Sequence, residues 1–206
     1  MDINELLKRY AAHERDFTGM ILPSANFSEV ALQGIILHCA DLSGANLNLA
    51  VLRGANLDQS DLSAATMWRT QLVETHLVAS NLSKASLIRA NLERANLQCA
   101  YLAQADLRLT NLQAANLQRA NLTGADLRYA DLRGADLSQS NLCRVNFTGA
   151  NLADVNLDGA TLTGAILSQV DLTQLRLSEA HCFSHQELWD SSRPASTEVS
   201  SVTSRS

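Results

Sequence analysis

A large apolar residue returns at every fifth position through most of this chain. Between residues 22 and 177 there are 32 such central positions, 29 of them Leu, and no insertion breaks the spacing. The exceptions are Phe27, Met67 and Phe147. Two residues before each central position lies a smaller residue, most often Ala. An α-helix favours an apolar period near 3.6 residues and a β-strand a period of 2, so a period of five fits neither element.

A period of five fits a chain that turns a corner every five residues. Four pentapeptides then close a square coil, with the central and small residues pointing inward and the other three positions facing water. Successive coils are expected about 4.8 Å apart, paired by parallel backbone hydrogen bonds. This predicts about eight coils in a rod roughly 39 Å long. Each buried Leu contributes about 1.5–3 kcal/mol, so the interior holds the fold without disulfides or metal.

The positions of glycine and proline support this interpretation independently. A type II turn needs a positive φ at its third residue, where Gly is least strained. Pro23 directly follows the central Leu22, which suits the fixed φ of a second turn residue. All nine glycines lie two residues after a central residue: Gly19, Gly34, Gly44, Gly54, Gly124, Gly134, Gly149, Gly159 and Gly164.

The motif itself points to a known family. From residue 90 to 142 the chain repeats Ala-Asp/Asn-Leu-X-X, beginning Ala-Asn-Leu-Glu-Arg and Ala-Asn-Leu-Gln-Cys. This pattern resembles the pentapeptide repeat family, and the resemblance covers most of the chain. It implies an all-β solenoid, a right-handed quadrilateral parallel β-helix. The opening stretch 2–12, followed by Glu-Arg-Asp-Phe, looks like cyanobacterial members of the family.

Four segments are predicted along the chain. Residues 1–14 form an N-terminal capping helix, with Asp2 at its start and Glu5 three residues on. A partner-binding role for this helix remains an alternative. Residues 15–179 form the β-helix. Residues 180–190, where a capping box precedes Trp189, form a short C-terminal cap, and the Ser- and Thr-rich residues 191–206 are expected to be disordered.

Composition predicts a soluble, cytoplasmic protein. The formal net charge is −5, no apolar run is long enough to span a membrane, and no signal peptide pattern opens the chain. The cysteines show no paired spacing. Cys39 and Cys99 fall on one face three coils apart, about 14 Å, which is too far for a disulfide. His181, Cys182 and His185 lack an evident fourth ligand, so a metal site is not favoured.

The sequence does not predict an enzyme. Asp or Asn precedes most central residues, but the two alternate freely at an outward position, which favours hydrogen bonding to the backbone or along a ladder over acid–base catalysis. The chain shows no Ser/His/Asp constellation and no Gly-rich phosphate loop, and it implies no concave pocket. We therefore expect no catalytic residue, no cofactor and no bound metal.

One face differs from the other three when outward residues are sorted by the twenty-residue coil. Each of five successive coils offers an exposed apolar residue there, and the last four add an arginine. Contiguous exposed apolar residues mark contact sites, and Trp, Tyr and Arg are enriched in binding hot spots. The alternative is that arginine stems merely cover their apolar neighbours. We call this candidate partner-binding face the stripe: Leu49, Trp68, Arg69, Ile88, Arg89, Arg108, Leu109, Arg128 and Tyr129.

These features favour a non-catalytic scaffold or regulatory module that binds a protein partner or a second copy of itself. The coil from Asp61 to Ser80 departs most from the motif and crosses the stripe. The family resemblance also raises DNA mimicry directed at DNA gyrase, as in fluoroquinolone-resistance members, but the charge here is modest and the stripe is basic. Nucleic-acid binding through the arginines is a third hypothesis, which Asp106 and Asp126 on the same face oppose.

Overall fold

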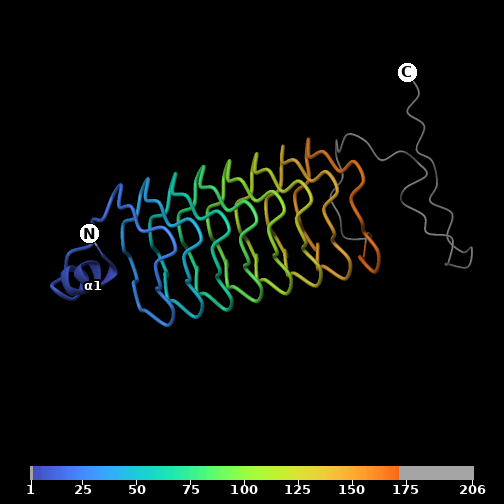
Figure 1. Cartoon of the computed structure of the whole chain (residues 1–206). Helices are drawn as coiled ribbons and strands as arrows, with labels where there is room; N and C mark the ends of the chain where they lie inside the picture. The colour runs from blue at the N-terminus through green and yellow to red at the C-terminus, as the bar shows by residue number, and fades with distance from the viewer. Residues whose placement is uncertain (1, 172–206) are drawn as a thin grey trace, which may run out of the picture.

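The computed structural model describes residues 2–171, which form a square-sided rod of stacked coils with one helix at its N-terminal end (Figure 1). The predicted C-terminal cap, 180–190, and the segment 191–206 lie outside the described residues, as do His181, Cys182 and His185. The fold is therefore described from the helix through the coil that ends near Val170.

The coils pair in parallel, each residue of the ladder bridging the residue twenty positions later. The bridges run without interruption from Asp16 with Ile36 to Asn146 with Ile166. Each side of the square contributes a single bridging residue, so residues 2–171 contain isolated bridges and no longer strand. The predicted fold, a right-handed quadrilateral parallel β-helix, is confirmed.

Every backbone N–H of a typical pentapeptide has an acceptor. The large central residue and the residue two after it donate to the next coil, the residue before it donates to the previous coil, and the small residue closes the turn. The fifth N–H, directly after the central residue, is satisfied by a side chain. For residues 95–99 the bonds are Ala95 to Leu92 O (3.0 Å), Asn96 to Thr75 O (2.9 Å), Leu97 to Asn116 O (2.7 Å), Gln98 to Asn96 Oδ1 (3.2 Å) and Cys99 to Gln118 O (2.9 Å).

The recurrent Asp and Asn residues supply this fifth acceptor. Asp41 Oδ1 accepts from Ser43 N at 3.0 Å, and the same bond recurs on most coils. Some Asn side chains also bond along the ladder, as Asn111 Nδ2 does to Asn91 Oδ1 at 3.1 Å. Because Asp and Asn both present Oδ1, either residue serves, which explains their free alternation. The predicted hydrogen-bonding role of these residues is confirmed.

The interior is filled by the two inward positions of each pentapeptide. From Phe17 to Leu162 the central residues are buried, and so are nearly all the small residues between them. Where the small residue is polar, its hydroxyl donates to a buried backbone carbonyl. Ser80 donates to Leu77 O at 2.8 Å, and Thr70 donates to Leu47 O of the previous coil, also at 2.8 Å. Buried polar groups are therefore paired, as a dry interior requires.

The corners are type II turns. The N–H of the residue three after each central residue donates to the central carbonyl, as Ala25 does to Leu22 at 3.2 Å. Only the third turn residue has a positive φ, and it does so at every corner from Gly19 to Gln169, whether or not it is glycine. Pro23 occupies a second turn position, as predicted.

Helix α1, Ile3–Ala11, lies against the first coil (Figure 1). Asp2 is its N-cap and accepts from Glu5 N at 2.9 Å. Leu6 is fully buried, while Leu7 and Tyr10 pack against the core of the rod. The Tyr10 hydroxyl also donates to Gln33 O at 2.9 Å, so the helix is held by both apolar and polar contacts.

Corner strain leads to a first prediction. Ala114 and Gly134 occupy the same corner of successive coils, with φ of 53° and 66°. A left-handed φ costs an L-residue about 1–2 kcal/mol, of which glycine's greater unfolded-state entropy offsets about 0.4–1 kcal/mol. We expect Ala114→Gly to stabilise the protein and Gly134→Ala to destabilise it, each by about 0.5–1 kcal/mol.

Thermal unfolding followed by circular dichroism checks this order of stability. A Cβ added at Gly134 meets no heavy atom within 4 Å, so the measurement reports backbone strain and not a clash. Equal melting temperatures for the three proteins would contradict the prediction.

Low pH gives a second prediction. Hydrogen bonds from Ser43 lower the pKa of Asp41, and those from Arg133 lower the pKa of Asp131. Burial would raise the pKa of Asp136, but hydrogen bonds from Ser138 and Gln118 bring it below its ordinary value. Because these folded-state pKa values lie below the unfolded value of about 3.9, their stabilisation is complete above that value and is lost as the pH falls through the folded-state values.

Replacing these three aspartates by Asn keeps the Oδ1 acceptor and removes the titration. We expect the triple variant to lose less thermal stability than the wild type as the pH falls below about 4. Melting curves from pH 6 to pH 2 test this. Parallel declines in the two proteins would show that other groups set the acid sensitivity.

Candidate functional site

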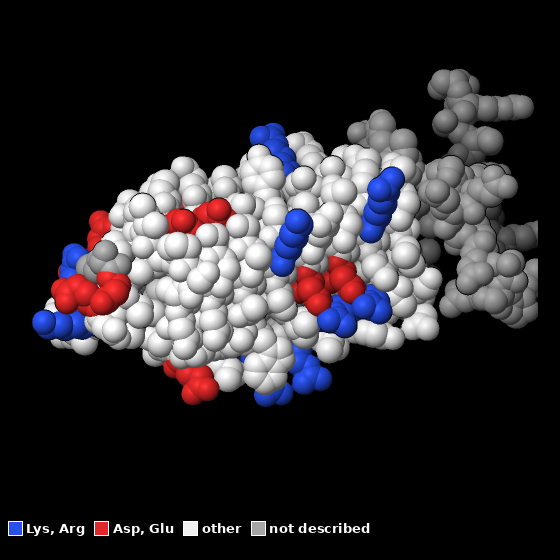
Figure 2. Space-filling model, in the orientation of Figure 1, with Lys and Arg blue, Asp and Glu red and all other residues white. Residues whose placement is uncertain are grey.

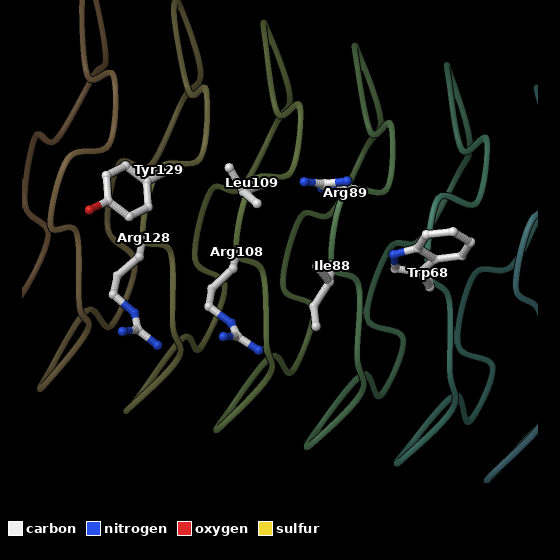
Figure 3. Close-up of a pocket in the computed structure, with 7 residues that line it drawn as sticks. All are labelled: Trp68, Ile88, Arg89, Arg108, Leu109, Arg128 and Tyr129. Carbon is white, nitrogen blue, oxygen red and sulfur yellow. The ribbon is translucent and has the colours of Figure 1, made fainter.

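The structure brings the nine stripe residues onto one face of the rod. The two residues after each of the central residues Leu47, Met67, Leu87, Leu107 and Leu127 stack directly along the ladder, and the stripe is made of these ten residues without Asn48. Figure 3 shows two rows running side by side across the coils: one holds Tyr129, Leu109 and Arg89, and the other holds Arg128, Arg108, Ile88 and Trp68.

The two rows line an open groove with a volume of about 410 Å³. Seven stripe residues form its walls, whereas Leu49 and Arg69 lie outside the lining. The expectation that the fold implies no concave pocket was therefore wrong. The backbone of the face is regular, and the hollow arises because long side chains stand on both sides of it, a feature that depends on side-chain conformation.

The stripe holds most of the large exposed apolar side chains of residues 2–171. Seven large hydrophobic residues are exposed within residues 2–171, and four of them belong to the stripe. Trp68 is 38% exposed, Leu109 47% and Tyr129 57%. The remaining three, Ile21, Tyr101 and Ile166, lie at positions outside the stripe. This clustering on one face distinguishes the stripe from the scattered exposure that is normal for folded proteins.

Three of these apolar residues, Leu49, Leu109 and Tyr129, also occupy strained corners. Leu109 and Tyr129 have φ of 60° and 58°, the left-handed region in which a large L-residue costs about 1–3 kcal/mol. Glycine would relieve the strain and remove the exposed apolar surface together. Every non-glycine corner from Ser24 to Gln169 has a similar positive φ, so this strain belongs to the fold and does not by itself mark a binding site.

The backbone N–H of Trp68 is bound by a side chain of the previous coil. The motif position ahead of Met67 holds Thr66, which offers no Asx oxygen to the N–H of Trp68. Asn48 of the previous coil accepts that N–H instead, at 2.7 Å. The same replacement occurs on the opposite face, where His76 takes the motif position and Asp58 accepts from Val78 N at 2.7 Å.

The arginines of the second row are neutralised by aspartates of the same face. Arg108 binds Asp106 through Nε (2.8 Å) and Nη2 (2.7 Å), and Arg128 binds Asp126 in the same way, at 2.9 and 2.7 Å. Both guanidinium groups turn away from the row of Leu109 and Tyr129 (Figure 3). Figure 2 shows acidic and basic groups next to each other in the C-terminal half of the rod.

These ion pairs shift the pKa values of Asp126, Arg108 and Arg128. Burial would raise the pKa of Asp126, but hydrogen bonds from Arg128 and the charges of Arg128 and Arg108 bring it below its ordinary value. The hydrogen bond to Asp106 raises the pKa of Arg108, and that to Asp126 raises the pKa of Arg128. Asp126, Arg108 and Arg128 therefore stay ionised near neutral pH.

The other two arginines of the stripe have no carboxylate partner within residues 2–171. The Arg69 guanidinium lies 4.7 Å from the centroid of the Trp68 ring, a cation–π contact. Arg89 stands between Leu109 and Trp68 across the rows (Figure 3). The uncompensated positive charge of the groove is thus at its Trp68 end.

A family model of pentapeptide repeats matches residues 25–63, 75–113, 105–144 and 140–179, which is more than half of the chain. The chain belongs to the pentapeptide repeat family. The identification made from the Ala-Asp/Asn-Leu-X-X motif is confirmed. The matching model describes a repeat and not a catalytic domain.

Several solved pentapeptide repeat structures are similar to this chain. HetL, from the cyanobacterium Nostoc sp. and involved in heterocyst differentiation regulation, has 31% identity over 82% of this chain and 96% of HetL, with a TM-score of 0.39. A protein of the Arabidopsis thaliana thylakoid lumen has 33% identity over 51% of this chain and 70% of its own, with a TM-score of 0.39. Full-length QnrB1, a plasmid-mediated fluoroquinolone resistance protein, has 17% identity over 77% and 92%, with a TM-score of 0.42.

A comparison with curated protein sequences found no match. Within residues 2–171, no group of three or more His, Cys, Asp or Glu side chains is arranged to hold a metal ion. Cys39, Cys99 and Cys143 are free thiols. No helix in the described part of this pentapeptide repeat protein is long and apolar enough to cross a membrane.

One residue that shapes the groove was missed from the sequence. Gly149 lies one coil beyond Tyr129, at the same corner, and the Tyr129 ring occupies the space beside it. A Cβ at residue 149 would lie 2.6 Å from two ring carbons. The twenty-residue register alone places Gly149 next to Tyr129, so this contact was open to prediction.

A third prediction follows from this contact. Gly149→Ala should displace the Tyr129 ring, because a 2.6 Å approach is too close for the ring to stay where it is. Gly134→Ala, at an open corner, is the matched control with the same backbone strain. Ring resonances of isotope-labelled Tyr in NMR spectra should shift for Tyr129 only in Gly149→Ala. Unchanged Tyr129 resonances in both variants would show that the ring does not rest on residue 149.

Proposed function

We propose that this pentapeptide repeat protein is a non-catalytic interaction module that binds a protein partner through the stripe. The observation that carries the proposal is the clustering of Trp68, Leu109 and Tyr129 along one groove on a rigid face. Such an apolar patch with a polar rim, rich in Trp, Tyr and Arg, is typical of contact sites. The paired arginines and aspartates supply the polar rim.

The alternative that the arginines merely cover their apolar neighbours fits the geometry less well. If their stems covered the groove, its apolar side chains would be largely buried. Leu109 and Tyr129 instead remain 47% and 57% exposed, because Arg108 and Arg128 turn toward Asp106 and Asp126. The apolar surface therefore remains available to a partner.

The two nucleic-acid hypotheses are supported less. A phosphate backbone would have to compete with Asp106 and Asp126 for Arg108 and Arg128, and only two arginines of the stripe are uncompensated by a carboxylate within residues 2–171. Tight binding to DNA rests on many more phosphate contacts. Mimicry of DNA toward gyrase would need acidic side chains where the stripe carries arginine and apolar residues. Both hypotheses remain outcomes of the experiment below.

A fourth prediction tests this function by affinity capture from nuclease-treated lysate of the native host, analysed by mass spectrometry. We expect the wild type to capture a protein that the double variant Trp68→Ala, Leu109→Asp loses by tenfold or more, since hot-spot truncations cost about 2 kcal/mol or more each. The matched control, Tyr101→Ala with Ala79→Asp, removes an exposed aromatic ring and adds a carboxylate at a left-handed corner outside the stripe.

Circular dichroism must first show that all three proteins melt alike. Capture that is equal for the stripe variant and the control would contradict the proposal. A stripe-dependent signal that appears only when the nuclease treatment is omitted would support a nucleic-acid ligand instead. A stripe-dependent change in mass by light scattering, without a captured protein, would identify a second copy as the partner.

A further inference from the structure

The groove is chemically asymmetric along the rod. Arg89 lines it near the Trp68 end, with Arg69 beside that end outside the lining, and neither has a carboxylate partner within residues 2–171. The Tyr129 end carries Arg128, which is held by Asp126. Apolar surface is present at both ends, but uncompensated positive charge is present only at one. A complementary ligand therefore carries a negative charge toward the Trp68 end and apolar groups toward the Tyr129 end.

We infer that the stripe binds an acidic amphipathic segment of a protein, with a carboxylate at Arg89 and an apolar side chain on Leu109 and Tyr129. This inference rests on the proposed function and names the chemistry of the partner. Charge complementarity carries it, because opposite charges across an interface steer association and exclude wrong partners. A carboxylate at Arg89 would gain a bidentate, charge-assisted contact that no described residue of this chain provides.

The coil spacing sets the geometry of that segment. Arg89, Leu109 and Tyr129 belong to three successive coils of one row, so Arg89 and Tyr129 lie roughly 10 Å apart along the rod. An α-helix covers that distance in about seven residues and an extended chain in about three. The acidic and apolar residues of the partner should be separated by one of these two spacings.

Charge also disfavours a second copy of this chain. Both faces of such a contact would carry the same uncompensated Arg69 and Arg89, and like charges across an interface are unfavourable. The ion pairs of Arg108 and Arg128 offer no free carboxylate to receive them, because each aspartate is already bound in a bidentate manner. An acidic partner has no such conflict.

A fifth prediction tests the inference with a displayed library of random sixteen-residue peptides. The library is selected on the full-length protein after removal of peptides that bind the Trp68→Ala, Leu109→Asp variant. We expect the selected peptides to be enriched at least threefold in Asp and Glu over the starting library. We also expect an apolar residue at three or seven positions from the acidic one.

A parallel selection on Arg89→Glu supplies the decisive comparison. This variant should enrich Lys and Arg in place of Asp and Glu, and the best acidic peptide should bind it at least tenfold more weakly by fluorescence anisotropy. Arg119→Glu is the matched control, because Arg119 occupies a left-handed corner on the opposite face. It should select the same acidic peptides as the wild type.

The outcomes separate this inference from the function on which it rests. Pools of equal composition on wild type and Arg89→Glu, or no peptide that depends on the stripe, would overturn the acidic segment. A stripe-dependent partner captured from lysate would then still support the interaction module. If the wild type selects acidic peptides that bind only through the stripe, and Arg89→Glu selects basic peptides in their place, both proposals are supported.

Discussion

The rod depends on a complete pairing of its backbone N–H groups. Within a pentapeptide, three N–H groups reach neighbouring coils and one closes the corner, so a single donor is left without a backbone acceptor. An unpaired backbone donor that is shielded from water is costly. The Asp or Asn before most central residues supplies the missing oxygen, as Asn96 does for Gln98. The motif therefore requires a hydrogen-bond acceptor at one position and buried apolar side chains at two others.

This pairing also explains how one coil can depart from the motif without breaking the frame. Thr66 and His76 lack an Asx oxygen, yet Asn48 and Asp58 of the coil before reach across the ladder at 2.7 Å. The inward position tolerates Thr70 because its hydroxyl finds a carbonyl of the previous coil. Because neighbouring coils share their acceptors, the outward residues of a coil can vary while the backbone stays fixed.

The fold followed from the sequence because two independent regularities agreed on it. The spacing of Leu defined the coil, and the glycines and Pro23 defined its corners without having been used to set the register. The stripe followed as well, since residues twenty apart must stack. The groove within the stripe could not be predicted, because its shape depends on the conformations of the side chains. Arg108 could have lain across Leu109, and only the contacts with Asp106 show that it does not.

If the stripe binds a partner as we propose, the same contacts prepare the groove for it. Ordering a free arginine at an interface costs about 0.5–1.5 kcal/mol, and each bidentate aspartate contact has already restrained one before a partner arrives. The ladder fixes the spacing of the two rows, and Gly149 leaves a place for the Tyr129 ring. Arg89 is the exception, since no carboxylate of residues 2–171 holds it. A rigid apolar groove with one uncompensated cation favours ligands that bring an acid to that point. In the binding mode that we propose, Arg89 therefore sets the selectivity and its apolar neighbours supply the affinity.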